Sequence, residues 1–218
     1  MKILFLTDDF PPLSYGGAGI AAFNLAEAFK EKGHEVFIIT TCQERSLVKD
    51  FDYKGIKVSR IYSDYNPRWR AYLSLCNFKI IPLIKKKIKE VEPDVIHAHN
   101  IHYYLSYYSL KLAKKKCKKV FLTAHDVMPF HYGKLIDFVS PETSLDDDLD
   151  YRVSAWQQFI KFKKRYNPLR NIIIKHYLRY ANKIFAVSFS LKKALNQNGI
   201  NNVEVIHNGI NIKKWTSI

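Results

Sequence analysis

Long apolar runs are absent from this sequence. No stretch approaches the ~20 residues that a membrane-spanning helix requires. The first apolar stretch, residues 2–7, is also too short for the core of a signal peptide and runs directly into Asp8 and Asp9. We therefore expect a cytoplasmic protein without a signal peptide.

Cysteine is scarce. The three cysteines, Cys42, Cys76 and Cys117, are odd in number, lie far apart and form no C-x-x-C pair. This pattern argues against a disulfide framework and against a zinc knot, both of which need closely patterned cysteines. We expect three buried or idle thiols.

Acidic residues are few relative to basic ones. The 35 Lys and Arg outnumber the 20 Asp and Glu, which leaves a net charge of +15. Such an excess favours an anionic partner, namely nucleic acid, an anionic membrane surface or phosphorylated small molecules. No helix-turn-helix, RNP, KH or zinc-finger pattern accompanies the charge, so nucleic acid is not the expected partner.

The basic residues gather in three stretches, 85–89, 111–119 and 161–179, and in the last of them aromatic and aliphatic side chains interleave with the charges. Amphipathic basic helices suit a lipid headgroup surface, which would place the protein at the periphery of a membrane. Lysine-rich helix faces that are simply solvated explain the same pattern equally well.

Short apolar runs alternate with helical text along the whole chain. The runs expected to be strands are residues 2–7, 35–41, 56–61, 94–98, 120–124, 183–187 and 203–206. A helix should follow the first run and end at Gly33, and a second should span residues 70–90 with a break near Pro82. This alternation predicts an α/β, Rossmann-like, doubly wound and mainly parallel sheet in a single domain, residues 1–218.

The periodicity lapses over residues 127–151. This segment contains Pro129, Gly133, Pro141 and an acidic run at 146–150. A long loop after a strand end is predicted to be a lid or an acceptor loop. The acidic run lacks the spacing of a calcium loop, so a solvated loop is the simpler interpretation.

A glycine-rich loop joins the first strand to the first helix. Gly16, Gly17 and Gly19 precede or begin that helix, where unpaired backbone N–H groups and the helix dipole favour an anion such as a phosphate. Glycine is expected there either for close approach to a ligand or for a positive φ. The text matches neither the dinucleotide fingerprint nor the P-loop, so the signal is of moderate strength.

Polar residues follow nearly every predicted strand. Because the carboxyl ends of parallel strands share one edge of the sheet, these residues predict a polar ligand crevice there. The candidate binding residues at strand ends, beside the three glycines, are Asp9, His99, Asn100, Asp126 and Ser188.

Histidines supply the strongest candidates for chemistry. His97 and His99 lie on one face of a strand, with His102 and His125 nearby, but no well-placed carboxylate completes a familiar zinc set, so we expect no metal. His125 is the candidate catalytic residue, because at a strand end it can hydrogen-bond a sugar hydroxyl or a developing charge. The alternative is that His125 is a loop histidine whose hydrogen bonds are satisfied within the protein.

Two other groups have simpler interpretations. Ser188 precedes a helix and should act as its N-cap, and without a G-x-S-x-G elbow serine hydrolase chemistry is not expected. Free carboxylates at Asp8 and Asp9 would repel a phosphate, so positioning of an acceptor hydroxyl or of the loop suits them better.

Six phrases in a fixed order carry a family resemblance. They are Phe10-Pro11-Pro12 with Gly16-Gly17-x-Gly19; Leu25-Ala26-x-Ala28-Phe29 with Lys32-Gly33-His34-Glu35-Val36; Pro93-Asp94-Val95-Ile96-His97-Ala98-His99; Thr123-Ala124-His125-Asp126; Ala186-Val187-Ser188; and Val205-Ile206-His207-Asn208-Gly209-Ile210. Together they resemble the N-terminal domain of retaining family 4 glycosyltransferases, which have the GT-B fold.

The resemblance implies two facing Rossmann-like domains, of which this chain holds the N-terminal, acceptor-binding one. Gly16 and Gly17 would then lie near the donor diphosphate and the acceptor, and His125 would contact the transferred sugar. Asn208, a further binding candidate, would lead into the C-terminal donor-binding domain, which is absent from the chain. The nucleotide-sugar donor is a co-substrate, and neither a protein nucleophile nor a cofactor is implied.

The sequence thus predicts half of an enzyme that moves a sugar from a nucleotide-sugar to a glycan, lipid or other hydroxyl acceptor. Alone it should be inactive, because it needs its donor domain or a partner chain. Two alternatives stay open: a stand-alone, non-catalytic sugar- or nucleotide-binding module, and a basic nucleic-acid-binding domain.

Overall fold

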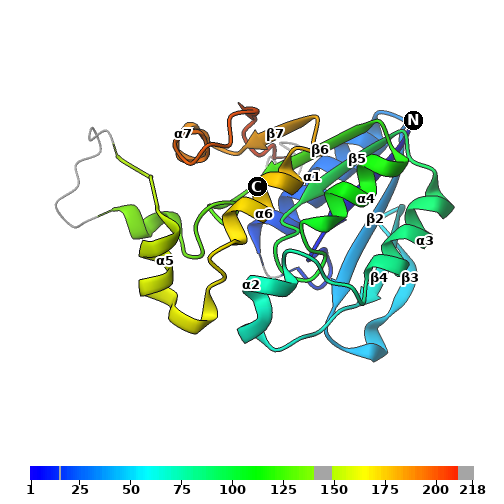
Figure 1. Ribbon diagram of the computed structural model, residues 1–218. Coiled ribbons are helices and arrows are strands. Elements are labelled where there is room, and N and C mark those ends of the chain that lie inside the picture. The colour runs from blue at the N-terminus through cyan, green and yellow to red at the C-terminus, as the bar shows by residue number, and fades with distance from the viewer. Residues whose placement is uncertain (15, 140–148, 211–218) are drawn as a thin grey trace, which may run out of the picture.

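A computed structural model describes residues 1–14, 16–139 and 149–210 of the 218-residue chain (Figure 1). Eight strands form one sheet in the order β3-β4-β2-β1-β5-β6-β7-β8. The strands are β1 (Lys2–Thr7), β2 (Glu35–Cys42), β3 (Lys49–Tyr53), β4 (Ile56–Tyr62), β5 (Val95–His99), β6 (Lys119–Ala124), β7 (Lys183–Ala186) and β8 (Val203–Val205). Every neighbouring pair is parallel except β3 with β4, which confirms the mainly parallel, doubly wound sheet.

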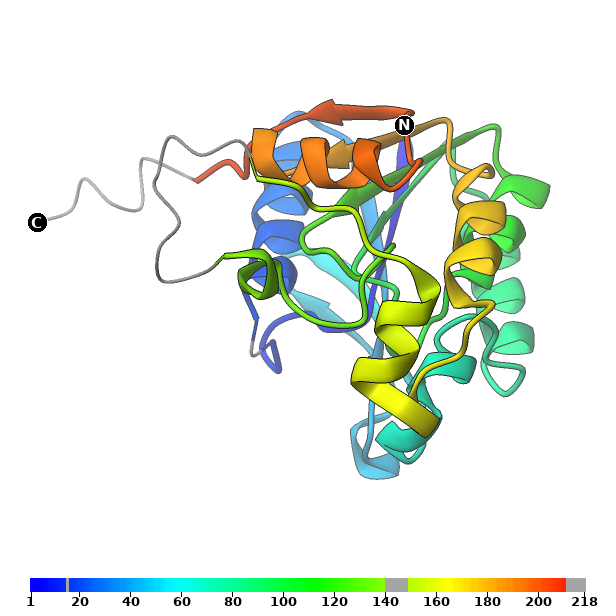
Figure 2. The same ribbon diagram turned by 60° about the vertical axis from the view of Figure 1, so that its left-hand side comes forward.

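Helices cover both faces of the sheet, as Figure 2 shows, with α1 and α7 on one side and α3, α4 and α6 on the other. The α-helices are α1 (Gly17–Glu31), α2 (Arg70–Leu73), α3 (Ile81–Val91), α4 (Tyr108–Lys116), α5 (Ala155–Phe162), α6 (Arg170–Leu178) and α7 (Phe189–Gln197). The fold is therefore a three-layer α/β sandwich of the Rossmann type.

The central strand β1 explains why the strands are continuous apolar runs. Leu4 and Leu6 belong to the core cluster that α3 and α4 share, whereas Ile3 and Phe5 belong to the cluster under α1. Side chains alternate across a strand, so a strand buried on both faces needs apolar residues at every position. This two-sided burial is what the apolar text of residues 2–7 indicated.

One strand was not predicted. Strand β3 pairs antiparallel with β4 at the sheet edge, where Lys49, Asp50 and Asp52 remain largely exposed. An edge strand needs no apolar alternation because one side of its ladder faces solvent. The predicted break of the helical segment near Pro82 is confirmed: α2 ends at Leu73, α3 begins at Ile81, and Pro82 lies in the first turn of α3, where its missing N–H costs nothing.

The third basic stretch is not one helix. Residues 161–179 comprise the end of α5, a short 3₁₀ turn at Lys163–Arg165 and then α6. In the segment without periodicity, Leu135–Phe138 forms another 3₁₀ turn, while most of the acidic run lies outside the described residues.

Cys42, Cys76 and Cys117 are free thiols, as predicted, and two of them are buried. No helix within the described residues is long and apolar enough to cross a bilayer.

Candidate functional site

Asp8 ties three elements together at the carboxyl edge of the sheet. Its carboxylate accepts backbone N–H bonds from Tyr103 (2.7 Å), Tyr104 (2.9 Å) and Leu105 (2.7 Å) in the loop after β5. Its backbone carbonyl accepts the hydroxyl of Thr41 at 2.7 Å. Burial raises the pKa of this carboxyl to about 7, although the three N–H groups oppose that shift. Asp8 therefore positions a loop and is not free to meet a ligand.

Asp9 holds the glycine-rich loop against α1. Its Oδ2 accepts the Ser14 hydroxyl at 2.7 Å. A Cβ at Gly19 would lie 2.2 Å from Ser14 Oγ and 2.9 Å from Asp9 Oδ2, closer than atoms can approach. Gly19 is thus required by the loop that packs on the helix, whereas close approach to a ligand was the expected reason.

The N-terminus of α1 is open to solvent. Gly16 is its N-cap, with an extended backbone (φ −129°) and no side-chain cap, and the first turn holds no acidic residue. A Cβ at Gly17 would meet open space. None of Gly16, Gly17 and Gly19 has a positive φ, so that expectation is wrong. The first-turn amides lack a side-chain acceptor and remain available to an anion.

His99, which is buried, and His125, which is half-buried, form a pair close to the loop before α1, since the charge of Asp9 in that loop partly opposes the effect of burial on the pKa of His125. His99 Nδ1 lies 3.0 Å from His125 Nε2, so one neutral ring donates to the other. Burial lowers the pKa of His125, and it lowers the pKa of His99 well below the usual value, with the neighbouring histidines adding to the effect. Within the described residues His99 Nε2 is buried and has no hydrogen-bond partner. Both rings are therefore neutral hydrogen-bonding groups near neutral pH.

His97 continues this row on the same face of β5, as predicted. Its Nε2 lies 2.8 Å from Thr123 Oγ1, and its ring stacks on Phe5 with centroids 5.6 Å apart. Burial lowers its pKa to about 3. Among the described residues, no cluster of three or more His, Cys, Asp or Glu side chains could hold a metal ion.

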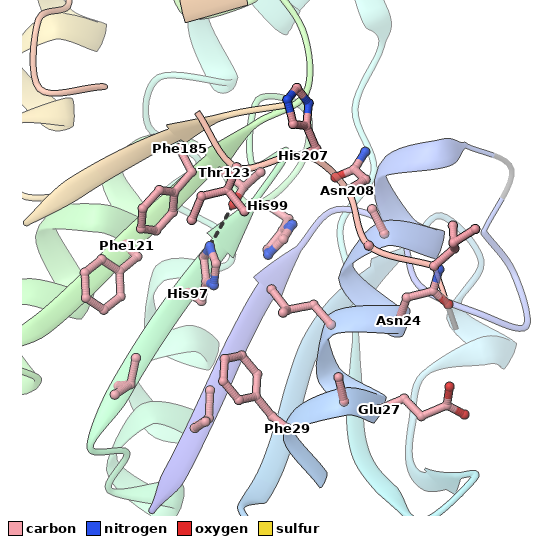
Figure 3. A pocket seen from close by; sticks show the side chains of 18 of the residues that line it. Asn24, Glu27, Phe29, His97, His99, Phe121, Thr123, Phe185, His207 and Asn208 are labelled. Atoms are coloured by element: carbon pink, nitrogen blue, oxygen red, sulfur yellow. Dashed lines mark hydrogen bonds between the residues drawn. The ribbon is translucent and has the colours of Figure 1, made fainter. Parts of the chain in front are cut away.

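A cavity of about 700 Å³ opens between α1 and the sheet (Figure 3). Its lining is mostly apolar and includes Phe29, Phe121 and Phe185. Of the predicted site residues, His99 and Asn208 line it, while the others do not. The His99 ring thus lines the cavity and also contacts His125, which lies at the carboxyl edge of the sheet.

The remaining predicted residues lie around the same sheet edge with structural partners. Asp126 Oδ2 lies 3.4 Å from His102 Nε2, and its Oδ1 accepts the Met128 N–H at 2.9 Å. Ser188 Oγ accepts the Leu191 N–H at 3.2 Å and caps α7, as predicted. Asn100, at a positive φ of 38°, accepts the Asp8 N–H through its carbonyl.

Two arginines near this edge escaped sequence reasoning. The Arg70 guanidinium lies 3.4 Å from the Tyr103 ring centroid and 5.6 Å from that of Tyr132, and Arg170 lies 5.4 Å from the same Tyr132 ring. In the described part of the chain neither arginine forms an ion pair, and Arg70 Nε and Nη2 are buried without partners. In the sequence, Arg70 and Arg170 stand out only because each begins a helical segment. The 35 basic residues of the chain obscure that signal.

Comparison with solved structures shows the same fold as GT-B glycosyltransferases. Sucrose-phosphate synthase from Thermosynechococcus elongatus matches with a TM-score of 0.66 and 17% identity over 97% of this chain and 49% of that chain. The catalytic domain of starch synthase IV from Arabidopsis thaliana, bound to ADP and acarbose, matches with a TM-score of 0.56 and 18% identity over 98% of this chain and 52% of that one.

A curated relative is similar in sequence. An uncharacterized 42.6 kDa protein in the cps region of Klebsiella pneumoniae is 31% identical over 144 residues, which cover 60% of this chain and 38% of the relative. The chain thus spans about half the length of the structures it matches, and less of this relative.

The family model for Glycosyltransferase Family 4 matches residues 15–214, nearly the whole sequence. The matched residues include the three glycines before and in α1, the histidines of β5, and residues 206–210, which line the cavity. The family seen in six short phrases is therefore confirmed, although Phe10-Pro11-Pro12 precedes the matched residues, and the chain belongs to glycosyltransferase family 4.

Proposed function

We propose that this chain is the acceptor-binding half of a retaining glycosyltransferase, which moves a sugar from a nucleotide-sugar to a hydroxyl of a glycan, lipid or other acceptor. The observation that carries the proposal is the neutral His99–His125 pair close to the loop that leads into the uncapped N-terminus of α1. One feature suits a sugar hydroxyl and the other suits a phosphate, and a nucleotide-sugar contains both.

The roles follow from the contacts. The first-turn amides of α1, at Gly17 and the two residues after it, would hold the donor diphosphate with the help of the helix dipole. His125 uses Nε2 toward His99, which leaves Nδ1 for a sugar hydroxyl or a developing charge. These groups position reactants and stabilise charge, so the reaction needs no protein nucleophile and, we propose, no metal or other cofactor.

A second, donor-binding half completes the proposal. The curated relative has a mass of 42.6 kDa, whereas this chain has 25.5 kDa. We propose that the donor half follows Asn208 in a longer protein or belongs to a partner chain, and that the 218 residues alone transfer no sugar. The intact mass of the native protein distinguishes these two arrangements.

The test is transfer by the complete enzyme, either the longer native protein or this chain with its donor-binding partner. His125→Ala should lower kcat at least ~100-fold, the usual range for a general acid–base or charge-stabilising group. The matched control is His176→Ala, which removes an exposed histidine of α6. Nuclear magnetic resonance of the product reports whether the anomeric configuration is retained. Equal rates for the two variants, or an inverted product, would contradict the proposal.

A further inference from the structure

Three apolar side chains of α5 face away from the protein. Trp156, Phe159 and Ile160 are spaced i, i+3 and i+4 and so share one helix face, yet they are 68%, 39% and 57% exposed. The rings of Trp156 and Phe159 stack with centroids 5.9 Å apart. Figure 1 shows α5 at the outer edge of the molecule, away from the sheet.

A glutamine occupies the inward side of α5. Gln158 is 2% exposed. Its Oε1 accepts the Tyr132 N–H at 2.8 Å, and its Nε2 donates to the Phe130 carbonyl at 3.0 Å. Rotating α5 to bury its apolar stripe would break both bonds and leave buried polar groups unpaired. The outward orientation of the stripe is therefore built into the fold.

The other basic helices have the opposite arrangement. In α3, Ile84 and Ile88 are buried while Lys85 and Lys89 are exposed. In α4, the buried residues include Leu110 and the lysines cluster in the last turn. The apolar faces of both helices belong to the core, so their lysines are simply solvated. At α5 and the 3₁₀ turn that follows it, by contrast, exposed cations adjoin an apolar helix face that is itself exposed.

Basic residues outnumber acidic ones around α5. Residues 151–180 contain no Asp or Glu. Lys161 is neutralised by Asp137, whose Oδ2 lies 2.9 Å from its Nζ. Lys163 and Arg165 are exposed, and among the described residues neither has an acidic partner. Apolar side chains next to unpaired cations make a surface suited to anionic lipid.

We propose that this surface docks the protein on an anionic membrane. The surface, called here the α5 face, consists of Trp156, Phe159, Ile160, Lys163 and Arg165. The indole and the aliphatic side chain would enter the interfacial region, where tryptophan is favoured, while the cations would contact lipid phosphates. A second copy of the chain is a poor occupant, because two molecules of net charge +15 would meet through equally basic surfaces.

Vesicle sedimentation tests the apolar part. The chain should sediment with vesicles of phosphatidylglycerol and phosphatidylethanolamine at low salt, and far less with phosphatidylcholine. The double variant Trp156→Ala/Ile160→Ala should reduce the bound fraction at least tenfold. Its control, Leu83→Ala, removes a partly exposed leucine of α3 and should bind as the wild type does. Circular dichroism verifies that both variants are folded.

Matched charge reversals test the basic part. Lys163→Glu/Arg165→Glu and Lys85→Glu/Lys89→Glu change the net charge equally, but only the first pair lies on the α5 face. The first should reduce binding to anionic vesicles at least tenfold, and the second much less. Equal losses would mean that the total charge matters rather than this surface, and the proposal would then be wrong.

Tryptophan fluorescence locates the inserted side chain. The chain has three tryptophans, Trp69, Trp156 and Trp215. Anionic vesicles should shift the emission to shorter wavelength in Trp69→Phe/Trp215→Phe, which keeps Trp156 alone, and not in Trp156→Phe. Absence of vesicle binding would overturn the proposal. Self-association in solution that Trp156→Ala/Ile160→Ala abolishes would also overturn it, because the α5 face would then bind a second copy of the chain. The measurements involve no sugar transfer, so their failure leaves the proposed function unaffected.

Discussion

Two helices, α1 and α7, begin at the same edge of the sheet and begin differently. Each is the next element after a strand, β1 or β7. The first turn of α7 is closed by Ser188 Oγ, which accepts the Leu191 N–H, whereas α1 starts at Gly16 without any side-chain cap. The Ser188 cap stabilises α7, whereas in the proposed function the open start of α1 would hold a phosphate.

Acid should affect the α1 side of the sheet most. Burial lowers the pKa of His97 to about 3 and of His102 to about 4, and the pKa of His99 well below the usual value. These rings bind protons in the unfolded chain below about pH 6.5 but not in the folded one, so stability is full above that pH and lost as pH falls. Asp8, whose pKa is raised to about 7, binds a proton in the folded chain over pH 4–7, so its contribution to stability increases as pH falls. Because several histidines oppose this one carboxyl, the histidines should determine the net effect.

The free energy of unfolding should therefore drop by about 1.4 kcal/mol per pH unit for each excess proton as pH falls from 6.5 to 5. Urea unfolding at a series of pH values measures it. The variant His97→Gln should lessen the slope, and His176→Gln, an exposed control, should not. A flat profile would show that these histidines are not buried in neutral form.

Filling the space at Gly19 should disrupt the start of α1 and leave α7 intact. In Gly19→Val the added Cβ would lie 2.2 Å from Ser14 Oγ, and overpacking of this kind costs about 1–3 kcal/mol. Chemical denaturation measures the loss. Gly17→Val is the matched control, because a Cβ there meets nothing within 4 Å; it should cause no loss of stability, since valine has a higher helix propensity than glycine. Equal losses would contradict the close contact.

Removing the side-chain cap of α7 and adding one to α1 should have the smallest effects on stability, and these two changes test the difference between the helices directly. Ser188→Ala removes the α7 cap and should cost about 1 kcal/mol. Gly16→Ser offers α1 a cap at a position whose backbone is already extended and whose Cβ would have ordinary contacts; it should stabilise by only a few tenths of a kcal/mol. Thermal unfolding measures both.

The same Gly16→Ser variant should bind inorganic pyrophosphate more weakly than the wild type, because the serine oxygen competes for the first-turn amides. Ser188→Ala should leave that affinity unchanged. If the two variants bind pyrophosphate alike, the open end of α1 is not an anion site.

Sequence reasoning recovered the elements that local text defines. The strands through Leu4, Ile38 and Leu122 have continuous apolar runs at their centres because they are buried on both faces, and such runs are visible without a structure. Edge strand β3 was missed because an edge has no such requirement. The Ser188 cap and the interruption of the helical segment near Pro82 were both foreseen from neighbouring residues.

The candidate site was likewise predictable only in part. Polar residues at strand ends were identifiable, because parallel strands bring their carboxyl ends to one edge. The partners of those residues were not. That Asp8 would accept three amides from a loop some 95 to 97 residues away, and that His99 would meet His125, depends on the order in which β1, β5 and β6 lie side by side.

The sequence by itself determined the class of the fold, the family and the set of polar residues at the sheet edge, since these follow from hydrophobic periodicity and short phrases. The tertiary structure alone decided which of them are free. It made Asp8 part of the scaffold, left the start of α1 uncapped, and turned Trp156 outward by burying Gln158. Composition records which groups are present, but only the packing of distant segments determines which of them already have a partner.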